Sequence, residues 1–339
     1  MEYRRLGASG LKVSKICLGA MMFGEHAAPA VASRIVGSAL EAGVNFIDTA
    51  DSYGTEEGDS ERIVGKLIAK NRDGWVLATK FANKVIPADP NSGGHGRKWM
   101  LRAAERSLKR LNTDYIDVYY LHKDDPDTPF DESLRAMEDL IRSGKVRYFG
   151  LSNFQGWRIA ALAAECRRLG VPQPVVLQPY YNALYRAAEV EMLPACRHYG
   201  LGVVPYSPLA RGVLTGKYRP GVKPSKDSRG GRGEPRFMET EMRPESLRIA
   251  QQLKAHCEKR GVKLAHFAFA WVLNNALVTS ALAGPRTFEQ WQDYLAALKY
   301  RFTAADEALV DRLVPRGHPS TPGYTDPKYP VAGRVLLTG

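Results

Sequence analysis

The chain has 339 residues, of which 44% are hydrophobic and 25% are charged. These proportions are typical of a folded globular protein and exclude disordered, fibrous and disulfide-stapled miniprotein classes. No apolar run approaches the roughly 20 residues that cross a bilayer, and no apolar signal region opens the sequence. The four cysteines are scattered without a C-x-x-C pair, which disfavours a zinc ribbon or a disulfide framework. We therefore expect a cytoplasmic protein.

The charge is basic, with 48 Lys and Arg against 36 Asp and Glu and a formal net charge of +12. Such an excess fits nucleic acid, a membrane surface or a small anionic ligand. No helix-turn-helix, RNP motif or zinc finger is present, so we expect neither a nucleic-acid nor a membrane partner. Many cations fall on expected helix faces, and a phosphate-bearing cofactor needs only a few. The oligomeric state stays open, and a homo-oligomer is compatible with the sequence.

The first predicted element is a β-hairpin within residues 3–19, with its turn at 8–10, that leads into a strand at 16–18. Apolar strand segments then alternate with helical segments whose apolar residues recur every three or four positions. The further predicted strands cover residues 44–48, 75–79, 115–120, 146–151, 175–178, 203–206 and 279–282. The predicted helices cover residues 30–41, 59–69, 98–111, 131–143, 157–169, 187–198 and 264–274.

This alternation requires parallel strands joined by crossover helices, in either a doubly wound sheet or a closed barrel. A dinucleotide-binding doubly wound sheet should carry G-x-G-x-x-G after its first strand, but GAMMFGE stands there instead. Eight units over about 280 residues fit a barrel. We therefore predict a single α/β domain over residues 1–339, a (β/α)8 TIM barrel with an N-terminal β-hairpin and extra C-terminal helices.

Two regions fall outside the alternation. Residues 208–243 are rich in Gly, Pro, Lys and Arg, which predicts a long functional loop after the seventh strand. Residues 315–339 contain five prolines and are predicted to form a C-terminal tail that is mobile or ordered by contact.

Active sites of such barrels lie at the carboxyl ends of the strands, and this rule selects a group of polar side chains. Asp48 ends the second strand, and Tyr53 follows in the next loop. Lys80 ends the third strand and His122 ends the fourth. Each of these residues alone has a structural explanation, as a loop brace, a packing ring or a core imidazole. A buried Lys80 needs a partner to stay charged, however, and Asp48 on the adjacent strand is the obvious one.

The same group suits proton donation by a phenol. An unperturbed tyrosine has a pKa of roughly 10 and is a poor acid near neutrality. A neighbouring ammonium is expected to lower that pKa. Tyr53 beside Lys80 is therefore predicted to be a tuned general acid, with His122 orienting or polarising a substrate oxygen.

Several longer stretches point to a known family. In chain order they are YRRLGASGLKVSKICLG, GVNFIDTADSYG, ATK, SLKRLNTDYIDVYYLH, GKVRYFGLSNF, LQPYYN, PYSPLARGVLTGKY and AGPRTFEQW. Over about residues 2–314 the chain thus resembles the aldo-keto reductases, in the branch of bacterial reductases similar to potassium-channel β subunits. The resemblance implies NADPH-dependent reduction of aldehyde or ketone carbonyls to alcohols.

The resemblance also implies residue roles. Tyr53 would protonate the carbonyl oxygen, Lys80 paired with Asp48 would tune it, and His122 would orient the carbonyl. The nicotinamide would be held by Ser152, Asn153 and Gln178 and stacked by Tyr206. The remaining implied cofactor-binding positions are Ser207, Leu209, Gly212, Lys217, Arg229, Gly284, Arg286, Gln290 and Asp293.

The chain departs from the family pattern near the adenine, where Tyr294 replaces a common Asn. Asp293 is the candidate to take over part of that contact. The long loop is expected to bring Lys217 and Arg229 to the cofactor phosphates. Arg286, beside a helix N-terminus, is expected to bind the 2′-phosphate. The substrate pocket is expected to be walled by the first, third and fourth loops and the long segment 208–243. Its candidate residues are Met22, Phe23, Phe81 and Trp99.

Two other functions compete with the reductase. A metal-dependent barrel hydrolase would want clustered histidines, whereas the seven here are scattered and only His122 ends a strand, so no metal is expected. A cofactor-sensing regulatory subunit with little turnover, resembling channel β subunits, remains the alternative. The substrate itself is not specified by the sequence.

Overall fold

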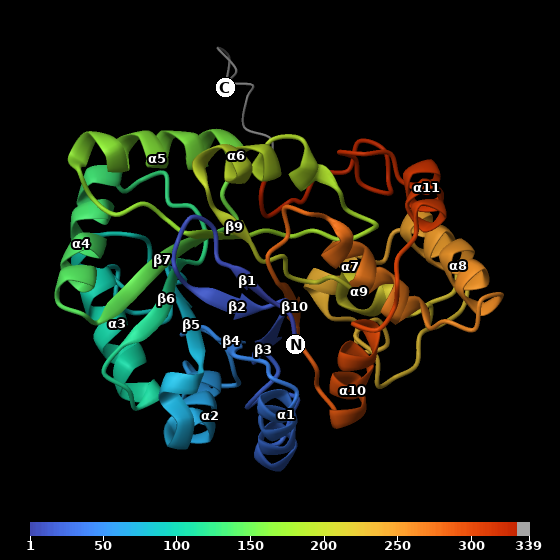
Figure 1. Cartoon of the computed structure of the whole chain (residues 1–339), viewed down its shortest axis with the longest axis horizontal. Helices are drawn as coiled ribbons and strands as arrows, with labels where there is room; N and C mark the ends of the chain where they lie inside the picture. The colour runs from blue at the N-terminus through green and yellow to red at the C-terminus, as the bar shows by residue number, and fades with distance from the viewer. Residues whose placement is uncertain (331–339) are drawn as a thin grey trace.

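The computed structural model describes residues 1–330, in which eight parallel strands form a sheet surrounded by helices (Figure 1). The strands are β3 (Ile16–Gly19), β4 (Phe46–Asp48), β5 (Val76–Phe81), β6 (Ile116–Leu121), β7 (Val146–Ser152), β8 (Val176–Gln178), β9 (Gly202–Val203) and β10 (Ala281–Ala283). They pair in the order β10-β3-β4-β5-β6-β7-β8-β9. The ring closes where Val203 bridges Val278 in parallel and the Leu282 amide donates to the Pro205 carbonyl at 3.0 Å. The predicted (β/α)8 barrel is confirmed.

The N-terminal hairpin closes one end of this barrel. Its strands β1 (Tyr3–Arg5) and β2 (Lys12–Ser14) pair antiparallel. At the turn Gly7 adopts a φ of +61°, and a Cβ there would lie 2.6 Å from the Gly202 amide nitrogen, so only glycine fits. Leu6 and Val13 of the hairpin pack into the apolar barrel interior. A large cavity lined by the strand-end residues Asp48, Ser152 and Gln178 lies at the opposite end of the barrel.

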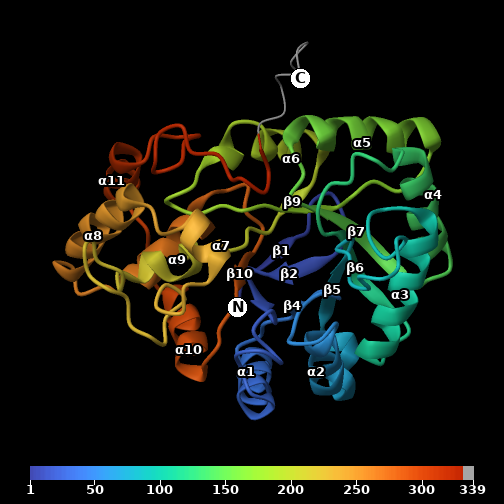
Figure 2. The ribbon, with the colours of Figure 1, turned by 180° about the vertical axis from the view of Figure 1, so that it is seen from behind.

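Helices cover the outside of the barrel on all sides, as the two opposite views show (Figures 1 and 2). They are α1 (Pro29–Glu41), α2 (Asp59–Ile68), α3 (Arg97–Leu111), α4 (Phe130–Arg142), α5 (Gly156–Leu169), α6 (Met192–Tyr199), α8 (Pro244–Glu258), α9 (Leu264–Asn274), α10 (Phe288–Ala297) and α11 (Ala304–Leu313). Most apolar side chains of these helices join one core cluster between helices and strands. Every predicted helix overlaps one of them. Helix α10 follows the eighth strand as the last barrel helix, and α11 lies beyond the barrel toward the C-terminus.

Three predicted segments differ from the structure. The helix expected at 187–198 is divided into a 3-10 turn at Ala187–Glu189 and α6. The strand expected at 203–206 is shortened to two residues, because Pro205 has no amide hydrogen to continue the ladder. The expected loop 208–243 contains a 3-10 segment at Ala210–Thr215 and helix α7 (Pro235–Thr240).

The C-terminal segment is ordered against the body through residue 330, and residues 331–339 lie outside the described part of the chain. The Ser320 amide donates to the Leu184 carbonyl at 2.8 Å, and the Ser320 and Ser246 hydroxyls lie 2.8 Å apart. Further along, buried Asp326 forms an ion pair with Arg236 of α7. The tail is thus ordered by contact up to this point, which returns it to the cavity end of the barrel.

Replacing two helix glycines by alanine should change the free energy of unfolding in opposite directions, because Gly65 lies where α2 packs on α3 and Gly37 is exposed on α1. A Cβ at Gly65 would lie 2.5 Å from the carbonyl carbon of Leu111, so Gly65→Ala should lower the free energy of unfolding by about 1–3 kcal/mol. Gly37, exposed on α1, has no neighbour within 4 Å, and Gly37→Ala should raise it by about 0.5–1 kcal/mol. Urea unfolding of both variants checks this. Equal changes in the free energy of unfolding for the two variants would contradict the close approach of Gly65 to Leu111.

Candidate active site

The centre of the site is a buried ion pair. Lys80 on β5 has no exposed side-chain surface and Asp48 on β4 has 2%. The Lys80 Nζ donates to Asp48 Oδ1 at 2.5 Å, to the Thr49 carbonyl at 2.7 Å and to the Tyr53 hydroxyl oxygen at 3.3 Å. All three ammonium hydrogens therefore have an acceptor, as a buried lysine requires.

The charge state of the pair follows from its surroundings. Burial alone would lower the pKa of Lys80, but Asp48 and Tyr53 raise it above its ordinary value. Burial raises the pKa of Asp48, and the neighbouring Lys80 ammonium and the Gln178 amide oppose that rise. Lys80 is therefore an ammonium at neutral pH.

Tyr53 differs from the expectation in one respect. Burial raises its pKa above 10, and the Lys80 ammonium lowers it by less than burial raises it. The expected net lowering is therefore wrong, because desolvation of the phenolate outweighs the adjacent cation. Since Lys80 has only hydrogens to offer, the Tyr53 oxygen accepts, and its own hydroxyl hydrogen is free to be donated into the cavity.

His122 is held as a neutral imidazole. Burial, then the ammonium groups of Lys80 and Lys328, lower its pKa well below 6.5. The Asn83 side-chain amide nitrogen lies 3.1 Å from His122 Nδ1 and also 3.1 Å from the Ser52 hydroxyl. An amide NH2 only donates, so Nδ1 accepts and the hydrogen sits on Nε2. The imidazole lies 5.7 Å from the Tyr53 ring, edge to face.

Four further side chains form a platform beside these groups. The Tyr206 hydroxyl donates to Asn153 Oδ1 at 2.9 Å, and Asn153 Nδ2 donates to the Ser152 hydroxyl at 3.0 Å. The Ser152 hydroxyl donates to the Gln178 carbonyl at 3.0 Å, and Gln178 Nε2 donates to Asp48 Oδ2 at 3.0 Å. Hydrogen bonds therefore run without a break from the platform to the ion pair.

Unusual backbone conformations collect at this end of the barrel. Among the described residues, six other than glycine have positive φ, and one of them, Asn112, ends helix α3. The other five follow strand ends at the site, and they are Ala82, Asn153, Ser207, Ala210 and Arg211. Such conformations cost energy and persist only where surrounding contacts hold them. At Ala82, with a φ of 108°, the chain turns directly before Asn83.

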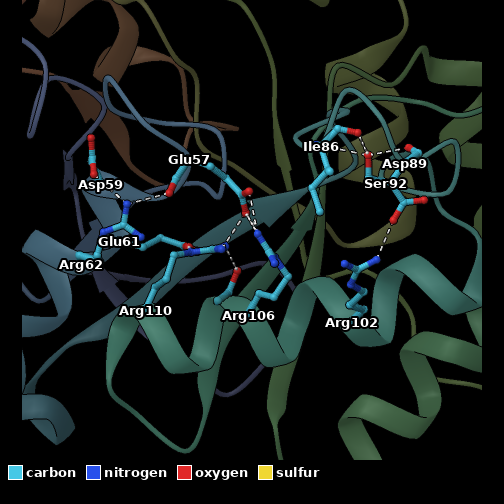
Figure 3. Close-up of polar contacts among 11 residues, drawn as sticks. Glu57, Asp59, Glu61, Arg62, Ile86, Asp89, Ser92, Arg102, Arg106 and Arg110 are labelled. Carbon is cyan, nitrogen blue, oxygen red and sulfur yellow. Dashed lines mark hydrogen bonds and ion pairs between the residues drawn. The ribbon is translucent and has the colours of Figure 1, made fainter.

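Helix α3 fastens the loop that carries Tyr53 (Figure 3). Arg106 pairs with Glu57 at 2.7 Å, and Arg110 pairs with Glu57 at 2.8 Å and with Glu61 at 2.5 Å. The Glu61 side chain is completely buried, so losing its partner would leave an uncompensated charge in the core. The loop behind Asp48 is thereby restrained from outside the barrel.

The same helix fastens the loop that carries Asn83. Arg102 of α3 pairs with Asp89 at 2.7 Å, and the Ser92 hydroxyl donates to the Asp89 and Ile86 carbonyls within that loop (Figure 3). The partner of His122 therefore also depends on contacts with α3.

One cavity of about 1030 Å³ joins nearly all the predicted site residues. Of the catalytic group, Asp48, Tyr53 and His122 line it, and Lys80 lies directly behind them. The predicted cofactor positions that line it are Ser152, Asn153, Gln178, Tyr206, Ser207, Leu209, Gly212, Lys217, Arg229, Gly284, Arg286, Gln290 and Asp293. Their convergence matches the expected arrangement, and their roles toward a bound cofactor remain predictions.

The predicted substrate pocket fits the structure less well. Met22 lines the cavity, and its sulfur lies 3.5 Å from the Arg229 guanidinium. Phe23, Phe81 and Trp99 are fully or almost fully buried and are not among the residues that line it. Phe81, for example, stacks on Tyr119 with ring centroids 4.7 Å apart. These three residues were the wrong choice for pocket walls, because their side chains point into the core.

Sequence reasoning also missed residues that do line the cavity. Asn83 follows the end of β5, so the strand-end rule could have found it. Lys328 and Tyr329 come from the tail, and no local pattern marks them.

Asp293, a predicted cofactor position expected near an adenine, already forms an ion pair with Lys263 at 2.6 Å.

Comparison with known proteins agrees with this geometry. Residues 15–315 match the model of the aldo/keto reductase family. The chain is 39% identical to the uncharacterized oxidoreductase YrpG of Bacillus subtilis, over 95% of this chain and 98% of that protein. It is 36% identical to a probable voltage-gated potassium channel subunit beta of Arabidopsis thaliana, over 88% of this chain and 91% of that protein. It is 32% identical to L-glyceraldehyde 3-phosphate reductase of Escherichia coli, over 94% and 93%.

The chain therefore belongs to the aldo/keto reductase family. Members of this family are oxidoreductases that use nicotinamide cofactors, and this protein is an NAD(P)H-dependent oxidoreductase of that kind. Within residues 1–330, no helix has the length and apolar character needed to cross a membrane.

The contact between Asn83 and His122 predicts how the imidazole responds to substitution. Asn83→Leu removes the donor and should lower kcat about tenfold, the loss expected for one hydrogen bond. Asn83→Asp should lower kcat further, because a carboxylate accepts a hydrogen bond from His122 Nδ1 and leaves Nε2 without a hydrogen to donate. Steady-state kinetics check this, with the exposed Asn91→Asp in the same loop as control. An Asn83→Asp enzyme as active as the native one would contradict the tautomer.

The buried ion pair predicts strong coupling between its members. Lys80→Met and Asp48→Asn should each lower kcat/KM, and Asp48→Asn should also lower the free energy of unfolding by roughly 3–5 kcal/mol because it leaves a buried cation unpaired. The double variant should lose less than the sum of the two. Urea unfolding and kinetics of all four proteins measure the coupling. Strict additivity would mean that the two side chains act independently.

Proposed function

We propose that the protein reduces aldehyde or ketone carbonyls to alcohols, with NADPH as hydride donor and Tyr53 as proton donor. The carrying observation is that the Tyr53 and His122 rings lie 5.7 Å apart in the lining of one cavity, each with a hydrogen to donate. A carbonyl oxygen has two lone pairs, and both donors would stabilise the negative charge that develops on it. Relatives whose names end in reductase support the same reaction.

The residues present fit a nicotinamide cofactor. Both hydrogens of Asn153 Nδ2 and one of Gln178 Nε2 are donated within the protein. The Asn153 side-chain oxygen accepts from Tyr206 and keeps a second lone pair, and no side-chain donor contacts the Gln178 side-chain oxygen among the described residues. Acceptors are what the NH2 of a carboxamide needs. The bound cofactor would supply hydride, and Tyr206 would support its ring.

The protein's own groups would carry the proton. Tyr53 donates its hydroxyl hydrogen to the carbonyl oxygen, and the phenolate left behind is stabilised by Lys80 at 3.3 Å. His122 Nε2 holds the same oxygen and fixes its position. Because burial keeps Tyr53 protonated at neutral pH, the acid is in its donating form before substrate arrives.

Three cations would serve the phosphates. Within residues 1–330, Lys217 forms no ion pair and Arg286 binds only a carbonyl oxygen with its guanidinium, that of Asp227 at 3.1 Å. Arg229 is paired with Glu234 at 2.8 Å. Arg286 precedes α10, whose first turn offers backbone amides to an anion. We place the 2′-phosphate at Arg286 and the other phosphates near Lys217 and Arg229.

The decisive test of turnover removes the acid. Tyr53→Phe keeps the ring and should reduce carbonyl turnover by about 10²–10⁴-fold, while NADPH binding persists. NADPH oxidation with simple aldehydes measures the first, and protein fluorescence titration measures the second. Near-native turnover in the variant would remove Tyr53 from the mechanism. Tight NADPH binding without turnover of any carbonyl by the native protein would favour the cofactor-sensing subunit instead.

Cofactor preference is tested at Arg286. Arg286→Ala should weaken NADPH by roughly tenfold or more and NADH much less, because only NADPH carries the 2′-phosphate. Added salt should weaken NADPH binding more steeply in the native enzyme than in the variant. Fluorescence titration with both cofactors gives the result. Equal losses for the two cofactors would show that Arg286 does not contact that phosphate.

A further inference from the structure

Residues 326–329 of the C-terminal tail form a turn that lines the cavity. The Arg243 guanidinium covers the Tyr324 ring at 3.9 Å, and Thr321 donates to Glu245 at 3.1 Å, so the preceding stretch is fixed on α8. Asp326 then accepts from the Lys328 amide at 3.0 Å with its side chain and from the Tyr329 amide at 2.9 Å with its carbonyl. This turn directs Lys328 and Tyr329 into the cavity lining.

The Asp326 side chain is fixed by burial and by an ion pair. It is 6% exposed and pairs with Arg236 of α7, which also pairs with Glu239 at 2.8 Å. The position of Lys328 is therefore set by a buried carboxylate, even though Lys328 itself is exposed. An exposed lysine that merely solubilises a tail needs no such anchor.

Lys328 lacks a carboxylate of its own. Within residues 1–330 it forms no ion pair, and neither does the nearby Lys123. Partial burial lowers the pKa of Lys328, and the cations Arg236, Lys123 and Arg211 lower it further against the opposing Asp326 carboxylate. Lys328 lines the same cavity as His122 and Tyr53, and its ammonium contributes to the lowered pKa of His122. A cation in such surroundings gains more than an ordinary surface lysine from an external anion.

We propose that Lys328 binds an anionic group on the substrate, a carboxylate or a phosphate a few bonds from the carbonyl, and makes the enzyme selective for charged carbonyl compounds. The inference rests on the proposed reductase function. Tyr329 is half-buried and lines the same cavity as Lys328 and Tyr53. Lys328 is a specificity residue, and proton transfer stays with Tyr53.

We assign the cofactor phosphates to Lys217, Arg229 and Arg286, and the substrate anion to Lys328. The charged neighbours of Lys328 are Arg236, Lys123, Asp326 and Arg211. Arg286, at the proposed 2′-phosphate position, instead contacts Asp227 in the long loop. The two cationic regions therefore have separate contacts, and they can be tested separately.

The test compares matched substrates that differ in charge. One pair is 4-carboxybenzaldehyde with 4-nitrobenzaldehyde, and the other is glycolaldehyde phosphate with glycolaldehyde. In the native enzyme we expect the anionic member of at least one pair to have the lower KM. Lys328→Gln should reduce the anionic-to-neutral ratio of kcat/KM roughly three- to tenfold, mainly through KM, and Lys328→Glu should reduce it further. A change in only one pair identifies the anion as carboxylate or phosphate.

Two further variants separate charge from placement. Asp326→Ala retains the lysine but loses the turn, and it should lower the same ratio. Lys66→Gln, on the exposed side of α2, removes an equal charge far from the cavity and should leave the ratio unchanged. Added salt should lower the native ratio toward that of Lys328→Gln.

Specific outcomes overturn the inference. A ratio unchanged by Lys328→Gln in both pairs would do so, as would a loss of NADPH affinity as large as the loss of anionic substrate affinity. In either case, continued reduction of the neutral aldehydes would leave the proposed reductase function standing. Failure of the native protein to reduce any of the four aldehydes would instead refute the reductase function itself.

Discussion

The rest of the site depends on one constraint, the need to keep Lys80 charged inside a barrel whose interior is otherwise apolar. Asp48 supplies the opposite charge at 2.5 Å, and a backbone carbonyl and the Tyr53 oxygen take the remaining hydrogens. These acceptors fix the direction of the Tyr53 hydroxyl hydrogen, which can then only be donated elsewhere. The contacts that stabilise the buried charge therefore also leave a phenol hydrogen available for donation.

The same constraint extends to the expected cofactor platform. Asp48 shares its second oxygen with Gln178, and the hydrogen bonds continue through Ser152 and Asn153 to Tyr206. Each group in this series gives up hydrogens to the next, which leaves acceptors toward the cavity. A substitution at one end should therefore change the hydrogen bonding at the other end, as in any connected polar network.

The fold and the catalytic group follow from local patterns. Alternating strand and helix signals specify a barrel, and the strand-end rule selects Asp48, Lys80 and His122 before any family is considered. Other features depend on three-dimensional surroundings. The net pKa direction of Tyr53 follows from burial, and the inward orientation of Phe81 follows from packing on Tyr119. Lys328 reaches the cavity through an ion pair between residues 90 positions apart, which no local pattern encodes.

The most direct measurement of the account is the pH dependence of kcat for aldehyde reduction at saturating NADPH. In the proposed reaction Tyr53 donates a proton, so activity should be lost as pH rises through its pKa, which burial raises above its ordinary value of 10. The account predicts a plateau from about pH 6 to 9 and a fall only above about pH 10. A fall centred near pH 6–7, typical of a histidine giving up its proton, would make a charged His122 the acid and contradict the central role of Tyr53.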